Sequence, residues 1–182
     1  MSFKRKIIVY ISTSVDGYIA RPDGDVAWLD RPRPKGNYGM GAFNKSIDTI
    51  LWGRKTYSKG LEMGMKASWF DAGTQNHVFS RQPQESMEAG FKLVREPINA
   101  FVQGLRKKPG KNVWMMGGGE IIASFLDEGE IDEFIINVVP ILIGEGIPLI
   151  QARHRSIQLK LLSSKKFPDG VVTSQYQVTR KQ

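Results

Sequence analysis

Short runs of apolar, β-branched residues recur along the first two thirds of the chain and predict the strands of a sheet. We expect these strands at residues 7–11, 47–53, 77–79, 91–94 and 112–116, and from residue 133 to Pro140 within the run 133–144. Two later runs, 159–167 and 171–179, flank the turn sequence Pro168-Asp169-Gly170. This arrangement predicts an antiparallel hairpin at the end of the chain.

Amphipathic segments lie between the early strands and predict helices. Pro97 is expected at the first helical position of a helix that continues to about Lys107. Its apolar positions recur at helical spacing and form one face: Ile98, Phe101, Val102 and Leu105. We expect further helices at 40–46, from Arg54 onward and at 120–126.

The order of these elements predicts an α/β fold with a mostly parallel sheet and an antiparallel edge. A chain of 182 residues suits one domain, which we expect to span residues 1–182. Asp16-Gly17 and Asp23-Gly24 are typical turn sequences, and we assign Asp16 to turn geometry.

Three consecutive glycines, Gly117-Gly118-Gly119, separate the strand at 112–116 from the helix that begins at Glu120. A glycine turn at a helix start leaves backbone N–H groups open, and the helix dipole adds partial positive charge there. The turn therefore suits a phosphate, although a tight packing turn between strand and helix explains the same glycines. The spacing matches neither the dinucleotide-binding G-x-G-x-x-G motif nor a P-loop.

Two other strands end in the same way. The strand 47–53 ends at Gly53 and leads into Arg54, Lys55 and Thr56, and the strand 77–79 is followed by Ser80-Arg81. Parallel strands bring their carboxyl ends to one edge of a sheet, where α/β proteins bind ligands. A ligand with phosphates in more than one place, such as NADPH, fits these positions, and the alternative is that Arg54 and Arg81 are ordinary surface residues.

The composition removes several classes of function. The chain has no cysteine, which excludes disulfides and thiolate metal sites and favours a reducing, cytoplasmic compartment. No segment approaches the roughly 20 apolar residues of a membrane span, and neither His77 nor His154 has a partner at metal-ligand spacing. The net charge of +8 is scattered, so a nucleic-acid-binding function rests on charge alone.

Several motifs together resemble the dihydrofolate reductase-like superfamily, most closely the reductase domain of the bifunctional riboflavin-biosynthesis deaminase-reductase. In order along the chain they are SVDGYIA (14–20), DVAWL (25–29), ILWGRKTY (50–57), NHVFSR (76–81), VWMMGGGEIIASFL (113–126) and IDEFIINVVPILIGEGIPL (131–149). The resemblance covers nearly the whole chain and implies a three-layer sandwich. The deaminase half, with its cysteine-containing zinc motif, is absent.

The resemblance implies a cofactor site for NADPH. It assigns the 2′-phosphate and diphosphate end of NADPH to the turns after the strands at 47–53 and 77–79: Gly53, Arg54, Lys55, Thr56, Ser80 and Arg81. It assigns the diphosphate also to the glycine turn and the residues beside it: Met116, Gly117, Gly118, Gly119 and Glu120. It places the nicotinamide carboxamide near Ser12, Ile19 and Ala20, for which core and turn packing is the alternative.

On the substrate side, the resemblance makes Asp25 the candidate proton donor, and Trp28 and Asn137 the candidate substrate-binding residues. A buried carboxyl near hydride transfer gains a raised pKa and acts as an acid; the alternative is that Asp25 caps the short helix that holds Trp28. The short loop between Ile19 and Asp25 argues against a folate pocket, as does Ile122 where folate reductases usually carry tyrosine.

We therefore expect a reductase that transfers hydride from NADPH to a C=N or C=O of a small heterocyclic or phosphoribosylamino-pyrimidine substrate. The alternatives are a non-catalytic nucleotide-binding or sensing domain and a dihydrofolate reductase. We expect no nucleic acid, membrane or metal partner. A homodimer is expected because relatives in the riboflavin branch are commonly dimers.

Overall fold

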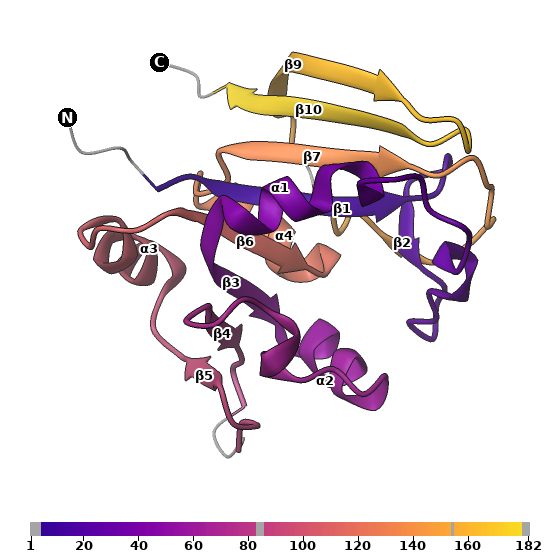
Figure 1. Ribbon diagram of the computed structural model, residues 1–182. Coiled ribbons are helices and arrows are strands. Elements are labelled where there is room, and N and C mark those ends of the chain that lie inside the picture. The colour runs from indigo at the N-terminus through magenta and orange to yellow at the C-terminus, as the bar shows by residue number, and fades with distance from the viewer. Residues whose placement is uncertain (1–4, 83–85, 154, 180–182) are drawn as a thin grey trace.

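A computed structural model describes residues 5–82, 86–153 and 155–179, and within them the chain forms an eight-stranded sheet in the order β5-β4-β3-β6-β1-β7-β10-β9 (Figure 1). Its strands are β1 (Ile7–Thr13), β3 (Ile47–Gly53), β4 (Gln75–Phe79), β5 (Phe91–Val94), β6 (Asn112–Gly117), β7 (Glu133–Val138), β9 (Gln158–Lys166) and β10 (Val172–Thr179). Two short strands, β2 (Tyr18–Ala20) and β8 (Ile147–Pro148), pair separately. The helices are α1 (Met40–Lys45), α2 (Arg54–Glu62), α3 (Ile98–Arg106) and α4 (Gly119–Asp127), with single 3₁₀ turns η1 (Ala27–Leu29), η2 (Asn37–Gly39) and η3 (Ala67–Trp69).

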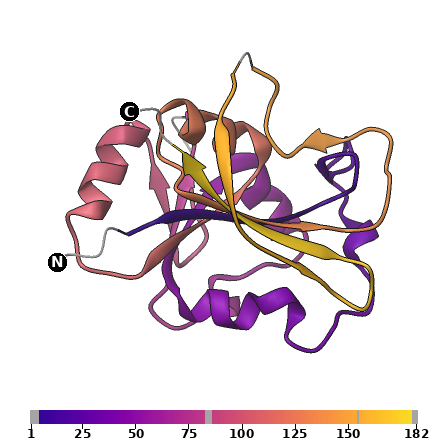
Figure 2. The ribbon, with the colours of Figure 1, turned by 90° about the horizontal axis from the view of Figure 1, so that it is seen from above.

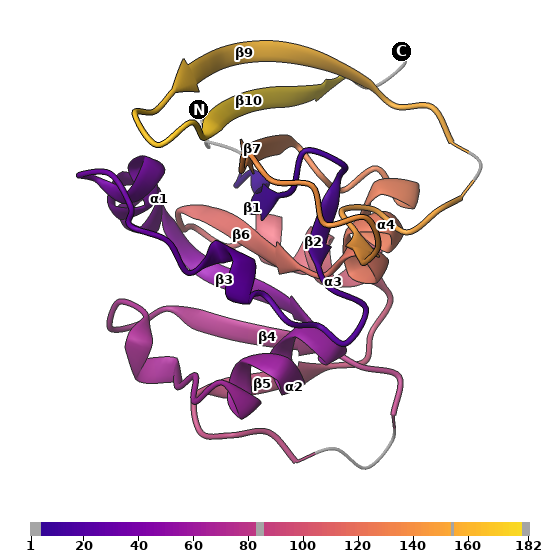
Figure 3. The same cartoon turned by 90° about the vertical axis from the view of Figure 1, so that its right-hand side faces the viewer.

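The strands from β5 across the sheet to β7 run parallel, and β10 and β9 continue the sheet antiparallel. The carboxyl ends of β4, β3, β6, β1 and β7 therefore meet at one edge. In Figure 1 the arrows of β1 and β7 point to this edge, and Figure 3 views the molecule from that side. The predicted mostly parallel sheet with an antiparallel hairpin is confirmed.

Helices cover both faces of the sheet because its central strands are apolar on both faces. Val9 and Met115 face a core that includes Val102 of α3 and Phe125 of α4. The alternate residues of the same strands face the opposite way, and Tyr10 and Trp114 pack with Phe43 of α1 and Tyr57 of α2. Figure 3 shows the resulting layers, with α1 on one side of β1 and β6 and α4 on the other.

The sequence pattern missed β2 and β8. They are three and two residues long, and Tyr18 pairs with Pro148 across most of the chain, so no local periodicity indicates them. Several boundaries also differ; β1 continues to Thr13 and β4 begins at Gln75. β7 ends at Val138 rather than at Pro140, and Pro97 is the residue before the first helical turn of α3 rather than its first member, with extended backbone at φ −55° and ψ 142°.

Candidate functional site

The strand ends that carry the predicted phosphate-binding residues are neighbours in the sheet. Gly53, at the end of β3, pairs with Phe79, the last residue of β4, and Trp52 pairs with Gly117 at the end of β6. The turns that follow these strands therefore lie side by side at the edge seen in Figure 3. The expectation that the predicted cofactor residues share one edge of the sheet is confirmed for Gly53, Ser80 and Gly117.

Each residue of the glycine turn has a reason within the protein for lacking a side chain. Gly117 has φ +107°, a conformation that favours glycine. A Cβ on Gly118 would lie 3.1 Å from the Thr56 hydroxyl, and a Cβ on Gly119 would overlap the carbonyl oxygen of Pro148. The peptide bond between Gly117 and Gly118 is cis. Close packing thus accounts for the triplet, while it also brings the turn against the first turn of α2.

The helices α2 and α4 both begin at this edge. α2 follows Gly53 and α4 follows Gly118, and within the described chain neither start has a side chain that caps its N–H groups. The two starts are close together, since a Cβ on Gly53 would lie 3.1 Å from the carbonyl oxygen of Gly117 and 3.0 Å from a methyl of Ile121. Open N–H groups and two helix dipoles make this edge attractive to an anion.

Exposed cations surround these helix starts and share one carboxylate. Arg81 and Lys55 lie 3.2 Å and 3.5 Å from the two oxygens of Glu120, the second residue of α4. The Arg81 and Lys55 side chains are 95% and 90% exposed, so these ion pairs are weak and either cation is accessible to an external anion. The Arg54 guanidinium donates hydrogen bonds to the side chain of Gln82, which follows β4, and to the Ser58 hydroxyl, one turn further along α2.

Ser80 and Thr56 occupy the same edge with different exposure. Ser80 is buried, and its hydroxyl accepts a hydrogen bond from the N–H of Gln82 at 3.1 Å. Thr56 is half-buried in the first turn of α2, close to Gly118. The hydroxyl of Ser80 therefore shapes the turn after β4, whereas Thr56 faces the glycine turn.

The residues expected near the nicotinamide, Ser12, Ile19 and Ala20, occupy β1 and β2, and Met116 lies on β6 beside the glycine turn. The Ile19 side chain reaches the glycine turn, 3.6 Å from the position of a Cβ on Gly118. Ala20 is buried and pairs with Ile147, which matches the packing alternative for this residue. Ser12 is half-buried near the end of β1, and Met116 packs on the core cluster on the α1 and α2 face of the sheet.

A hollow of about 160 Å³ adjoins this edge beside the ends of β1 and β7. It brings together Ser12 and Asn137, which are partners across the two strands. Its wall comes from the segment before and at the start of α1, for which the sequence predicted no role in a site. The lining residues are Tyr10, Ser12, Leu29, Arg31, Arg33, Asn37, Tyr38, Met40, Asn137 and Val139.

Asn137 forms the buried floor of this hollow. It is 2% exposed, and its Oδ1 accepts a hydrogen bond from the Thr173 hydroxyl at 2.5 Å. Burial raises the pKa of the neighbouring Tyr10, and a hydrogen bond with Asn137 opposes that shift. Both groups are therefore uncharged at neutral pH, and the floor is polar without charge.

Asp25 and Trp28 lie in the segment after β2 and outside the lining of the hollow. The Asp25 carboxylate accepts a hydrogen bond from the N–H of Ala27 at 3.2 Å, an Asx turn that leads into η1, whose N-cap residue is Val26. The catalytic role of Asp25 stays a prediction. The indole nitrogen of Trp28 is buried, and the described residues offer it no hydrogen-bond partner.

Asp16 does more than form a turn. Its carboxylate accepts hydrogen bonds from the N–H of Ile143 at 3.2 Å and of Gly144 at 2.7 Å, which ties the turn after β1 to the segment after β7. A hydrogen bond with the Ser14 side chain, together with these backbone bonds, lowers the pKa of Asp16. The contact joins residues more than 120 positions apart, so no local pattern in the sequence indicates it.

His77 has no part in this edge. His77 lies on β4 against the ring of Phe101, with ring centroids 5.1 Å apart, and burial lowers its pKa to about 4. His154 lies outside the described residues. Within residues 5–82, 86–153 and 155–179 no cluster of histidine, aspartate and glutamate is suited to hold a metal ion, and no helix is long and apolar enough to cross a membrane.

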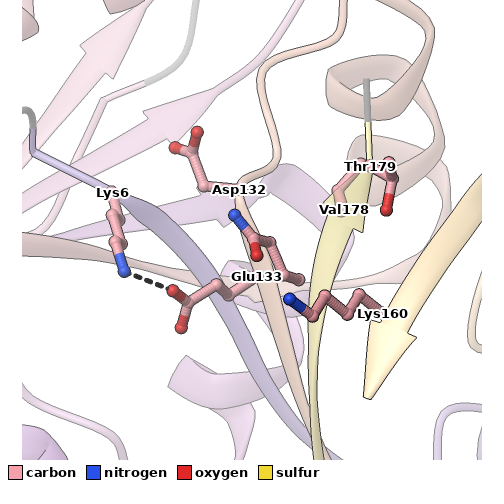
Figure 4. A pocket seen from close by; sticks show the side chains of 7 residues that line it. Lys6, Asp132, Glu133, Lys160, Val178 and Thr179 are labelled. Carbon is pink, nitrogen blue, oxygen red and sulfur yellow. Dashed lines mark hydrogen bonds and ion pairs between the residues drawn. The ribbon is translucent and has the colours of Figure 1, made fainter. Parts of the chain in front are cut away.

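A second, larger hollow of about 410 Å³ lies at the opposite edge of the sheet (Figure 4). Its charged groups neutralise one another. Lys6 lies 2.5 Å from the buried carboxylate of Glu133, which also accepts a hydrogen bond from Gln175 at 2.9 Å. Because these partners already satisfy the carboxylate, and because this edge holds the amino ends of the parallel strands, we place the candidate site at the other edge.

Comparison with known proteins gives a consistent family. Residues 5–173 match the model of the RibD C-terminal domain. The chain is 34% identical over 168 residues to the "Uncharacterized protein YwjB" of Bacillus subtilis (strain 168), covering 92% of this chain and 95% of that protein.

Solved structures agree with this. One is a "Putative riboflavin biosynthesis protein" from Shewanella sp. PV-4, with a TM-score of 0.84, 29% identity, and coverage of 96% of this chain and 99% of that chain. Another is the dihydrofolate reductase of Enterococcus faecalis complexed with NADP(H) and RAB-propyl, with a TM-score of 0.70 at 11% identity, covering 99% of this chain and 100% of that chain. The fold is therefore dihydrofolate reductase-like.

Proposed function

The chain belongs to the RibD C-terminal domain family, and from this premise we propose that it is an NADPH-dependent reductase acting on a small heterocyclic substrate. The observation that carries the cofactor assignment is the meeting of two uncapped helix starts, those of α2 and α4, with exposed cations at one edge of the sheet. The similar dihydrofolate reductase fold binds NADP(H) in its solved complex.

The residues at this edge fit a dinucleotide with separated phosphates. The N–H groups at the starts of α2 and α4 are suited to the diphosphate. Arg81 and Lys55 are suited to a further phosphate, because their only ion pairs in the described chain are solvent-exposed ones with Glu120. We assign the 2′-phosphate of the cofactor to this pair and to Thr56.

When bound, NADPH supplies a hydride to an electrophilic carbon. The chain's own contribution is to orient the two reactants and to exclude water from the carbon that is reduced. Ser12 and Asn137 are placed to orient the substrate, since both line the hollow beside the edge. Asp25 is our candidate for proton delivery, acting from the segment after β2.

The hollow would hold one ring or one charged group of a substrate rather than a whole substrate. At about 160 Å³ it is smaller than the roughly 300–1,000 Å³ typical of drug-sized ligand pockets. We propose reduction of a C=N or C=O in a substrate related to 5-amino-6-(5-phosphoribosylamino)uracil, and we disfavour dihydrofolate. A non-catalytic nucleotide-binding domain is the second candidate, because neither Asp25 nor any other carboxyl side chain is among the residues that line the hollow in the described structure.

Titration calorimetry with NADPH and NADH tests the cofactor assignment. We expect micromolar binding of NADPH and weaker binding of NADH. Turnover is then followed by loss of NADPH absorbance with phosphoribosylamino-pyrimidine, dihydrofolate and simple carbonyl substrates. Binding without turnover of any of them favours the non-catalytic alternative, and the absence of NADPH binding contradicts the proposal.

A further inference from the structure

The turn of the β9–β10 hairpin lies against the loop that forms the wall of the 160 Å³ hollow (Figures 2 and 3). Tyr38 donates its phenolic hydrogen to Oδ2 of Asp169 at 2.5 Å. Arg31 donates to the backbone carbonyl of Asp169 at 2.7 Å, and its guanidinium lies 3.8 Å from the carboxylate. One residue of the hairpin turn therefore holds two residues of the wall.

Tyr38 is held from several sides in a conformation that it would not adopt alone. Its φ is +57° and that of Asn37 is +43°, both in the left-handed region that non-glycine residues rarely occupy. Tyr10 donates its hydroxyl to the Tyr38 carbonyl at 3.0 Å, and the Tyr38 ring meets Phe167 edge-on with centroids 5.1 Å apart. Such backbone persists only where the surroundings determine it, and Asp169 supplies the polar part of these surroundings.

The hydrogen bond between Tyr38 and Asp169 is maintained over the neutral pH range. Burial and the Asp169 carboxylate raise the pKa of Tyr38, and the Tyr38 hydroxyl lowers the pKa of Asp169. The phenol therefore stays a donor and the carboxylate stays an acceptor.

The charges around the hollow leave one cation in excess. Arg31 is matched by Asp169. Arg33 also lines the hollow, and in the part of the chain that the structure describes it has no hydrogen bond or ion pair. The floor, formed by Ser12, Asn137 and Tyr10, adds polar groups without charge, so the lining as a whole attracts an anion.

We propose that Asp169 is a positioning residue of the substrate site, which neutralises Arg31 and holds Tyr38 so that Arg33 is left to bind an anionic group of the substrate. The inference rests on the proposed function and adds to it Arg33 as the residue that binds a negatively charged group of the substrate. It also gives the hairpin turn, more than 130 residues from Arg31 and Tyr38 in sequence, a role in the site.

Inorganic phosphate is a suitable probe of Arg33, because it needs no knowledge of the substrate. Amide chemical shifts are followed by NMR during titration with phosphate and, separately, with acetate, after NADPH has been added to fill the cofactor's phosphate sites. We expect phosphate to shift the amides of residues 31–39 and Arg33→Gln to weaken its binding at least tenfold. Stronger shifts with acetate would identify the anionic group as a carboxylate. Equal binding by Arg33→Gln, or shifts confined to other regions, overturns the proposal.

Asp169→Asn and Asp169→Glu test the positioning role. The matched control is Asp127→Asn, which removes a carboxylate that also pairs with two arginines, Arg153 and Arg155, at the far end of α4. We expect Tyr38→Phe, which removes the hydrogen bond to Asp169 without changing any charge, to weaken phosphate binding about fivefold or more. Asp169→Asn also frees Arg31, so its loss is expected to be smaller; Asp169→Glu restores the charge, and Asp127→Asn should leave phosphate binding unchanged.

Kinetic constants and the NADPH Kd distinguish a failure of this inference from a failure of the proposed function. With an active substrate, Asp169→Asn is expected to raise KM more than it lowers kcat, and to leave the NADPH Kd unchanged. Wild-type phosphate binding in both Asp169→Asn and Tyr38→Phe contradicts the inference while NADPH binding stands. Loss of NADPH binding in the wild type contradicts the proposed function instead.

Discussion

At the scale of single residues, Arg81 and Lys55 share one exposed partner, the carboxylate of Glu120. Surface ion pairs of this kind contribute little to stability, so the fold does not require the two cations, and the proposed function assigns them to the cofactor. Glu120 then acts as an internal counterion at the edge where the cofactor phosphates are proposed to bind. The chemistry of the site is thus carried by side chains that do little for folding.

Arg81→Gln is expected to raise the Kd of NADPH about tenfold and to leave that of NADH unchanged. A charge-assisted hydrogen bond to phosphate is typically worth about 1.5–3 kcal/mol, and the exposure of Arg81 favours the lower end. Calorimetry with both nucleotides measures this difference. Lys107→Gln, at an exposed position after the end of α3, is the control and should change neither Kd. Equal losses for NADPH and NADH would contradict the assignment of Arg81 to the 2′-phosphate.

His77 is expected to make the protein less stable as the pH falls from about 6.5 toward 4. Burial holds its pKa at about 4 in the folded chain, below the 6.5 of the free side chain, so the unfolded state binds more protons in this range. The resulting loss of unfolding free energy is about 1–2 kcal/mol, discounted for partial exposure. Urea unfolding at pH 7.5 and 4.5 measures it, and His77→Gln should show a smaller fall between the two values. An identical fall in both proteins would exclude this role.

At the scale of elements, the start of α4 is fixed by packing against β8 as well as by the strand before it. The lack of a side chain at Gly119 lets the first turn of α4 approach the carbonyl oxygen of Pro148. β8 in turn pairs with β2, which carries Ile19 to the glycine turn. The small second sheet therefore helps to position the edge of the large one.

Gly119→Ala is expected to lower the free energy of unfolding by about 1–3 kcal/mol, because the added methyl overlaps backbone that cannot move freely. Gly104→Ala, inside α3, has open space around the new methyl and should raise it by about 0.5–1 kcal/mol. Thermal or urea unfolding of the two variants makes the comparison. If Gly119→Ala is as stable as the wild type, the packing explanation for this glycine is wrong.

At the scale of the whole molecule, the sheet ends in an unusually exposed strand. All nine residues of β9 are exposed, among them Leu159, Leu161 and Leu162, of which Leu161 is 54% exposed. A long, apolar edge strand is a site for pairing with another chain. Figure 1 shows β9 as the outermost strand of the sheet, at the opposite end of the strand order from β4 and β5.

We therefore expect a homodimer in which β9 contributes to the interface, and Leu161→Lys to shift it toward monomer. The lysine would place a charge in an apolar contact and so weaken association. Size-exclusion chromatography with light scattering gives the mass of each form, with 20.5 kDa expected for the monomer. Thr173→Ser, on the neighbouring strand β10, leaves the exposed leucines intact and serves as the control. A monomeric wild type would refute this expectation.

The sequence by itself determined the positions of the helices and of the strands of the large sheet, and which edge of that sheet carries the candidate cofactor residues. Runs of β-branched residues and helical periodicity reflect local burial, so they located the strands of the large sheet, the four helices and the terminal hairpin. Glycines and cations immediately after β3, β4 and β6 marked the candidate cofactor edge, because parallel strands end on the same side.

Only the tertiary structure decided how distant segments complete the site. The contacts of Asp16 with Gly144, of Gly119 with Pro148, and of Asp169 with Tyr38 join residues that have no periodic relation in the chain. Periodicity reports which side of an element is buried, but not which segment covers it. In the sequence, the arginines of the segment before α1 belong to a scattered positive charge. The contacts of this segment with the hairpin turn show that it forms the wall of the hollow.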